Sequence, residues 1–376
     1  MRDPPFTLGI EEEYLLVDRQ TRDLVAKRPD AMMAELEKLL GPRVMPEFLT
    51  AQIEVATGIC ADIKAARKDL AELRRTVARV AEEYGMAIVA AATHPFANWS
   101  SATPTDKERY KILAHDLQGV GRRLLICGLH VHVGIDDDDL RIDLMSQIGY
   151  FLPHLLALST SSPFWRGRDT GLKSYRVAVF DELPRTGLPE QFASFGEYKR
   201  HVDILVSAGL IEDASKLWWD VRPSTRFPTL EMRLTDVPTL MEDSIAIAAL
   251  YQSLLRMLYR LRRGNQRWRR YAGMLVRENR WRAQRYGFDE GLVDFGKGAI
   301  VPYATLLDEL LELVREDAAA LNCAAEVAQA RQILARGTSA HRQIRTYQAA
   351  VDNGLPVGDA LQKVVDNLIV ETTAGL

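Results

Sequence analysis

The chain has 376 residues, of which 47% are hydrophobic and 26% are charged, which is typical of a globular protein. The formal net charge is only −3, so the overall charge does not predict binding to nucleic acid or to an anionic membrane. The N-terminal residues lack the apolar core of a secretory signal, and no apolar stretch is long enough to span a bilayer, so we expect a cytoplasmic protein.

Cysteine usage narrows the class of protein further. The chain has three cysteines, Cys60, Cys127 and Cys323, which lie far apart and form no C-x-x-C pair. This number and spacing exclude a disulfide framework and a thiolate zinc site. We expect each cysteine to be a small buried apolar residue.

The elements expected before residue 160 alternate between strands and helices. The clearest helix covers 62–84, where Ile63 and Val77 belong to a set of apolar residues at helical spacing. Asp62 suits the N-cap of this helix, and Gly85 ends it. In chain order we expect strands over 7–17 and 52–59, the helix over 62–84, a strand over 86–93, a helix over 106–125, a strand over 129–135, and a helix over 137–159 with a kink at Pro153.

Residues 161–190 follow without a periodic pattern and contain several prolines and glycines. A long irregular segment inside a compact chain is usually functional or disordered, and the aromatic and basic side chains here argue against disorder. We therefore expect a functional loop, within a sheet-rich part over about 1–240 and before a helical part over about 241–376. The elements expected after the loop are a helix over 195–208, strands over 216–222 and 229–235, and helices over 241–263, 266–286 and 303–317.

Four of the expected strands carry ionisable side chains on one face only. Residues i and i+2 of a strand face the same way, so Glu11 shares a face with Glu13, and His130 with His132. The other face is apolar, which is typical of an antiparallel sheet with one covered face and one solvated face. The same alternation pairs Gln52 with Glu54 and Glu231 with Arg233.

The charge of this face indicates its chemistry. Clustered carboxylates repel each other and raise each other's pKa unless cations neutralise them. Sets rich in oxygen ligands suit magnesium or manganese, which share their ligands with substrate phosphates. Arg233, on the same face as Glu231, is placed to hold a phosphate oxygen with its planar fork. The pattern therefore predicts a face that binds metal and phosphate.

Other interpretations remain open on the pattern alone. Any one of these strands, taken singly, is also typical of a solvated face. His130 and His132 suit a metal-dependent hydrolase. The arginine-dense stretch 256–285 suits a module that binds nucleic acid or protein without catalysis, although the negative net charge disfavours nucleic acid.

The chain contains six short motifs that are specific when taken together: LGIEEEY at 8–14, GLHVHVG at 128–134, PRTGLP at 184–189, WWDVRP at 218–223, TLEMR at 229–233 and ENRWRA at 278–283. With these motifs the chain resembles the YbdK-type carboxylate–amine ligases, the second glutamate–cysteine ligase family, from Leu8 to about Asp289. The resemblance implies a single catalytic domain over 1–376 of the α+β class. Its fold would be that of the glutamine synthetase and guanido kinase catalytic domains, a curved antiparallel sheet that lines a funnel and is backed by helices.

The resemblance also implies an activity. It predicts an ATP-dependent carbon–nitrogen ligase with weak glutamate–cysteine ligase activity, which forms an amide through an acyl phosphate and releases ADP and phosphate. The cofactors would be ATP and Mg²⁺, with Mn²⁺ as a substitute. The partners would be a glutamate-like carboxylate and cysteine or another amine, without nucleic acid or membrane, and we expect a homo-oligomer, namely a dimer.

Residue roles follow from the resemblance and the strand geometry together. The expected metal ligands are Glu11, Glu13, Glu54, Glu231 and His132. The expected catalytic residues are Arg233, Arg222 and Arg176, and the expected nucleotide contacts are His130, His132, Arg233, Asn279 and Arg282. The expected substrate contacts are Arg166, Lys173, Tyr175 and Arg185, on a loop that closes over the carboxylate and excludes water.

Overall fold

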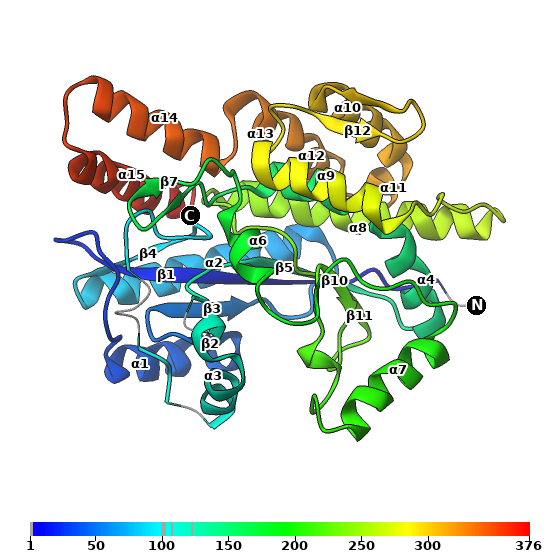
Figure 1. Cartoon of the computed structure of the whole chain (residues 1–376), viewed down its shortest axis with the longest axis horizontal. Coiled ribbons are helices and arrows are strands. Elements are labelled where there is room, and N and C mark those ends of the chain that lie inside the picture. Colours follow the sequence, from blue (N-terminus) through cyan, green and yellow to red (C-terminus); the bar gives the residue numbers. More distant parts are fainter. Residues whose placement is uncertain (1–2, 99–102, 107, 122) are drawn as a thin grey trace.

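A seven-stranded antiparallel sheet forms the centre of the computed structural model, which describes residues 3–98, 103–106, 108–121 and 123–376 (Figure 1). The strand order is β10-β11-β5-β1-β3-β2, and β4 also pairs with β1. The long first strand is therefore central, and the antiparallel α+β class expected from the sequence is confirmed. The strands are β1 (Leu8–Asp18), β2 (Val44–Pro46), β3 (Gln52–Ala56), β4 (Met86–Val89), β5 (Leu129–Gly134), β10 (Val221–Pro223) and β11 (Thr229–Met232).

Helices cover one face of this sheet and build the C-terminal part of the chain (Figure 1). The helix α2 (Ile63–Glu83) packs on β1 and β4, and the long helix α8 (Met241–Arg263) packs on α2 and β5. Because α8 also contacts helices from the C-terminal part, it is buried along most of its length and links the sheet to that part. The remaining C-terminal helices are α9 (Gly273–Tyr286), α10 (Tyr303–Leu313), α11 (Arg315–Ala320), α12 (Ala324–Ala328), α13 (Ala330–Arg336), α14 (Ser339–Asp352) and α15 (Val357–Thr372).

Local sequence signals explain several of these boundaries. The Asp62 carboxylate accepts a hydrogen bond of 2.8 Å from the Ala65 amide at the start of α2, as expected of an N-cap. The helix ends before Gly85, whose φ of 73° is favourable only for glycine. The three cysteines are free and buried, as expected.

The structure corrects other boundaries. The helix expected over 137–159 is two helices, α4 (Asp138–Ile148) and α5 (Leu152–Ser159), because Pro153 lies in the first turn of the second, where its missing N–H costs no hydrogen bond. The helix expected over 266–286 begins only at Gly273, and the helix expected over 303–317 stops at Leu313.

The sequence pattern did not indicate two further elements, α1 (Asp30–Leu40) and the hairpin of β12 (Leu292–Asp294) with β13 (Ala299–Val301). The irregular segment 161–190 contains short elements. They are the pair β6 (Phe164–Trp165) with β7 (Arg168–Asp169), the helix α6 (Tyr175–Phe180), and β8 (Thr186–Gly187), which pairs in parallel with β9 (Trp218–Trp219). The helices α3 (Glu108–Gly121) and α7 (Phe195–Ser207) complete the first two-thirds. Within the described residues, no helix has the length and apolar character needed to cross a membrane.

Candidate active site on the open face of the sheet

Strand register brings the ionisable residues of the four motif strands together. Glu11 of β1 lies opposite His130 of β5, and Glu231 of β11 lies opposite His132 of β5. On the other side of β1, Glu13 lies opposite Glu54 of β3. The even spacing of these residues along each strand therefore produces a single charged face, as the alternation predicted.

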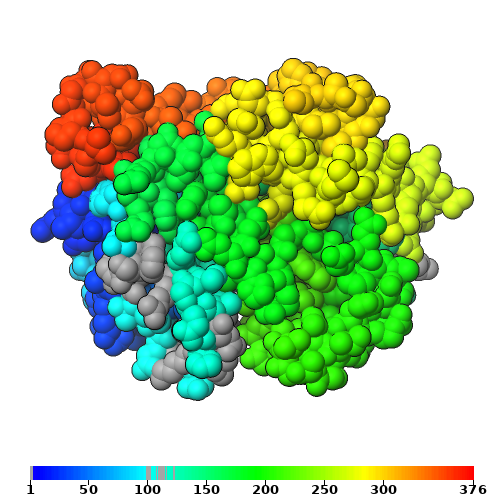
Figure 2. Space-filling model, viewed as in Figure 1, coloured from blue at the N-terminus to red at the C-terminus, as the bar shows by residue number. Residues whose placement is uncertain are grey.

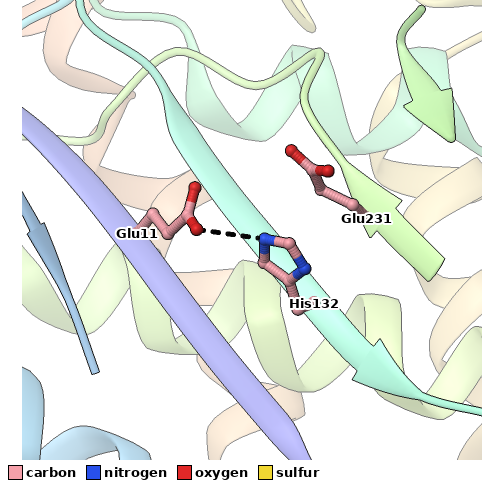
Figure 3. A group of neighbouring side chains, drawn as sticks. All are labelled: Glu11, His132 and Glu231. Atoms are coloured by element: carbon pink, nitrogen blue, oxygen red, sulfur yellow. Dashed lines mark ion pairs between the residues drawn. The ribbon is translucent and has the colours of Figure 1, made fainter. Parts of the chain in front are cut away.

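The side chains of Glu11, His132 and Glu231 converge on one point above the sheet (Figure 3). One ligand atom from each lies within 4.8 Å of the others. His132 Nε2 lies 3.2 Å from Glu11 Oε1, while His132 Nδ1 lies 2.9 Å from the Thr229 hydroxyl, which orients the ring. Burial disfavours the charged form of Glu11, but its hydrogen bonds with His130 and His132 outweigh burial and hold its pKa well below the usual range.

Two arginines neutralise Glu231, which is almost completely buried. Arg222 Nε donates to the Glu231 carboxylate at 3.0 Å, and Arg233 Nη1 donates to its other oxygen. Burial raises the pKa of Glu231, but the charges of Arg233, His132 and Arg222 outweigh burial and bring the pKa below its usual range. Arg233 keeps a buried Nε without a hydrogen-bond partner, so this guanidinium retains a donor for another anion.

On the β1–β3 side of the charged face, the nearby arginines do not neutralise all the carboxylates. Burial and the nearby charge of Glu47 raise the pKa of Glu13 to about 7, although Arg176 and the Gly128 amide partly offset them. Burial and the charges of Glu11, Glu47 and Glu13 raise the pKa of Glu54 well above its usual range. Glu47 was not predicted, because it stands in a turn-rich stretch and neither residue two positions away in the sequence is ionisable.

Arg176 lies beside these carboxylates, at the start of α6. Its guanidinium donates to the backbone carbonyls of Arg233 and Leu234 at 3.1 and 3.0 Å. A methyl group at Gly128 would lie 2.4 Å from Arg176 Nη2, so only glycine leaves room for this arginine. Arg176 therefore reaches the charged face from the loop expected to be functional.

The other predicted substrate contacts on this loop have partners within the protein. Lys173 Nζ lies 3.2 Å from the Asp289 carboxylate, and the Tyr175 ring lies 5.2 Å from the Trp165 ring. Arg185 donates to the Lys216 carbonyl at 3.0 Å and lies over the Trp218 ring. Arg166 is exposed. Closure of this loop over a substrate stays a prediction.

The two predicted nucleotide contacts on α9 bind the chain itself. The Asn279 side chain donates to the Val293 carbonyl at 2.8 Å and accepts from the Val293 amide at 2.7 Å. Arg282 donates to the Gly291 and Glu290 carbonyls. Both side chains thus fix the segment 290–293 beside α9, and their expected role toward a nucleotide has no support from these contacts.

The alternative interpretations gain no support from the structure either. His130 Nδ1 lies 3.2 Å from Glu11 Oε2, but only His132 belongs to the three-residue cluster, so the histidines do not form a paired site. Many of the arginines between 256 and 285 are paired inside the chain: Arg256 and Arg260 with Asp317, Arg262 and Arg267 with Asp143, and Arg280 with Asp181 and Asp220.

The residues present fit a divalent cation. Glu11, His132 and Glu231 offer two carboxylates and one imidazole, a set that suits magnesium or manganese. His132 Nε2 is buried beside Glu11 Oε1, and burial and neighbouring carboxylates disfavour the charged form of nearby Glu54. A cation at this position would bind the nitrogen and neutralise the carboxylates.

Comparison with known proteins gives a consistent result. A family model described as Glutamate-cysteine ligase family 2 matches residues 7–364. A Rhodospirillum rubrum protein named "Putative glutamate--cysteine ligase 2" is 61% identical over 100% of this chain and 98% of its own length. A Jannaschia protein of the same name is 57% identical over 98% of this chain and 97% of its own length.

Two solved structures share the fold at low sequence identity. The glutamate–cysteine ligase of Francisella tularensis, solved in complex with AMP, is 14% identical with a TM-score of 0.69, covering 100% of this chain and 90% of that one. A bifunctional glutathione synthetase from Pasteurella multocida is 16% identical with a TM-score of 0.70, covering 98% of this chain and 52% of that one. At these identities the likeness concerns the fold alone.

Proposed function

The chain belongs to glutamate-cysteine ligase family 2, and we propose that it uses ATP to join a glutamate-like carboxylate to cysteine or another amine. One observation carries the proposal. Glu11, His132 and Glu231 converge from three strands, and Arg233 lies against Glu231 with a buried donor still free. This arrangement suits the terminal phosphates of a nucleotide, which need both cations and directed N–H donors.

The chemistry requires such a face. A carboxylate is a poor electrophile, and transfer of a phosphoryl group to it creates an acyl phosphate from which an amine can displace phosphate. Phosphoryl transfer depends on positioning and charge neutralisation. A divalent cation held by Glu11, His132 and Glu231 would neutralise the terminal phosphates and the transferred group.

Three arginines of this chain would position the reacting groups. Arg233 would hold an oxygen of the transferred group through the donor that Glu231 leaves free. Arg222 would keep Glu231 ionised and in place, because its guanidinium is itself fixed by the Ser215 and Leu217 carbonyls. Arg176 lies beside Glu13 and would attract the carboxylate substrate, while the loop that carries it would exclude water.

The decisive experiment identifies the products. The protein is incubated with ATP, magnesium, glutamate labelled with oxygen-18 in its carboxylates, and a mixture of amines that includes cysteine. We expect a new amide by mass spectrometry, one ADP and one phosphate per amide, and one labelled oxygen in that phosphate. Glu11→Gln should abolish ADP release, whereas Arg79→Gln, an exposed change on α2, should not. Formation of AMP, or of phosphate without label, would contradict the acyl-phosphate route.

Metal dependence provides a second test of the same site. Ligands that are mainly carboxylates predict full loss of activity in EDTA and recovery with magnesium or manganese. Activity that survives EDTA, or that returns only with zinc, would count against the cluster of Glu11, His132 and Glu231 as the metal site.

A further inference from the structure

A separate cavity of about 660 Å³ lies at the start of α9. Three segments line it: the end of α4 with the residues after it, the segment 188–191, and residues 269–277. In Figure 2 the yellow segment that includes α9 lies above the recess, and the green segment lies below it. Its volume is within the range of ligand pockets. None of its lining residues belongs to the charged face of the sheet.

The cavity has an excess of positive charge. Arg269, Arg270 and Arg277 line it, and Glu190 is the single carboxylate among the lining residues. In the part of the chain that the structure describes, neither Arg269 nor Arg277 has an acidic group within ion-pair distance. Arg270 lies 3.8 Å from Asp143, a carboxylate that Arg262 and Arg267 already share. These arginines therefore lack enough counter-charge within the chain.

The lining also contains one buried polar atom without a hydrogen-bond partner, within the described residues. Arg270 Nε is buried and has no hydrogen-bond partner. Burial and the charge of Arg267 lower the pKa of Arg270, while Asp143 only partly offsets them. Arg269 lies 5.3 Å from the centre of the Tyr271 ring, which holds its guanidinium at the cavity. No side chain caps α9, so the partial positive charge of its N-terminus adds to the arginines.

We propose that this cavity binds a small anion with at least two negative charges on phosphate or carboxylate groups. Arginine forks bind both groups in a bidentate manner, and Arg269, Arg270 and Arg277 all line the cavity. The proposal goes beyond the ligase function. The cavity shares no lining residue with the face that would hold metal and ATP, and it shares residues 188–190 with the end of the loop 161–190.

Binding can be measured without turnover. The protein is freed of metal with EDTA and then transferred to metal-free buffer without EDTA, because EDTA is itself a polycarboxylate anion. Pyrophosphate, citrate and ATP are then titrated separately, with heat release as the readout. The double variant Arg269→Gln/Arg277→Gln removes two cavity charges, and its control Arg75→Gln/Arg79→Gln removes two exposed charges from α2. A second variant adds charge instead. Gly149→Glu places a carboxylate in the cavity, because a Cβ at Gly149 meets no atom within 4 Å, and Gly149→Ala is its control.

We expect at least one of the three anions to bind saturably, and both cavity variants to weaken its binding tenfold or more, with both controls unchanged. Binding of pyrophosphate and ATP without citrate would assign a phosphate ligand, and binding of citrate alone a carboxylate ligand. The proposal is overturned if none of the three binds, or if the α2 control weakens binding as much as the cavity variant. It is also overturned if Glu11→Gln, rather than the arginine changes, abolishes binding.

The test is independent of the ligase test, because EDTA removes the metal that the ligase reaction requires. Absence of anion binding would therefore leave the ligase proposal untouched, and absence of ligase activity would leave the anion proposal untouched.

Discussion

Glu12 stands between two predicted metal ligands, yet the structure gives it a different role. Its carboxylate faces the covered side of the sheet, where Arg74 Nε and Nη2 donate to it at 2.6 and 2.7 Å. Neither side chain of this ion pair is exposed. The hydroxyls of Tyr14 and Ser244 donate to the same carboxylate at 2.6 Å, so the pair joins β1, α2 and α8.

Glu12→Gln keeps the volume of this side chain and removes its charge. Breaking one side of a buried ion pair costs about 3–5 kcal/mol, because the remaining charge stays buried without a partner. Glutamine retains one oxygen as an acceptor, and Arg74 keeps its hydrogen bonds to the Pro238 and Thr239 carbonyls. We therefore expect Glu12→Gln to lower the free energy of unfolding by about 3 kcal/mol. Domains typically have about 5–15 kcal/mol of stability, so this single change would remove a large share.

Glu54→Gln is the matched control, and its expected effect on the free energy of unfolding does not share the sign expected for Glu12→Gln. The pKa of Glu54 is raised by burial and by neighbouring carboxylates, so its charged form destabilises the metal-free protein near neutral pH. Replacing it with a neutral residue should therefore leave stability unchanged or raise it. Both variants are measured by urea unfolding in EDTA with circular dichroism as the readout. A cost below about 1 kcal/mol for Glu12→Gln would refute the reasoning, as would an equal cost for Glu54→Gln.

Three further outcomes are expected. Glu231→Gln should lower ADP release at least a hundredfold, because it removes a predicted ligand and the partner of Arg233; near-normal release in a steady-state assay would be the contrary result. Gly128→Ala should lower kcat about tenfold or more and also lower thermal stability, because its methyl group would displace the buried Arg176 guanidinium from the Arg233 and Leu234 carbonyls; unchanged kcat in the folded variant would show that Arg176 needs no fixed position. Burial lowers the pKa of His94 to about 4 from an ordinary 6.5, so the unfolded chain binds the proton first and stability should fall as pH drops from about 6.5 towards 4. The loss would be up to about 3 kcal/mol in urea titrations, and an equally steep loss in His94→Asn would contradict this origin.

The strands of the site were predictable because the alternation in each strand is strict. His132 and Glu231 each have an apolar residue on either side in the sequence. Glu11 lies between Ile10 and Glu12, which both take the covered face. An antiparallel sheet then brings such residues together whatever their distance along the chain. The period of two also puts Glu12 on the covered face, but it did not reveal the cation that neutralises Glu12 there, because Arg74 lies on a helix.

The functional roles expected for residues outside the sheet stay predictions, because a motif does not reveal the partners of its residues. Asn279 and Arg282 belong to a motif that resembles the family, but their partners are backbone atoms of the segment 290–293. A motif shows that residues are needed together and does not show whether they bind a ligand or the chain. Glu47 was not predicted, because a single carboxylate in a turn-rich stretch gives no sequence pattern.

The position of β1 in the middle of the sheet has a consequence for synthesis on the ribosome. The Ser244 hydroxyl that completes the environment of Glu12 is 232 positions further along the chain. At a translation rate of about 5–20 residues per second, the nascent chain would wait roughly 10–50 s for this contact. During that time β3 can pair with one edge of β1, and β4 can pair with residues 15–18 of the other edge. Residues 8–12 of that other edge stay open until β5 has emerged, and β5 in turn waits for β11. An open strand edge invites pairing with other chains, so we expect the nascent chain to be open to such pairing along residues 8–12 until β5 has emerged.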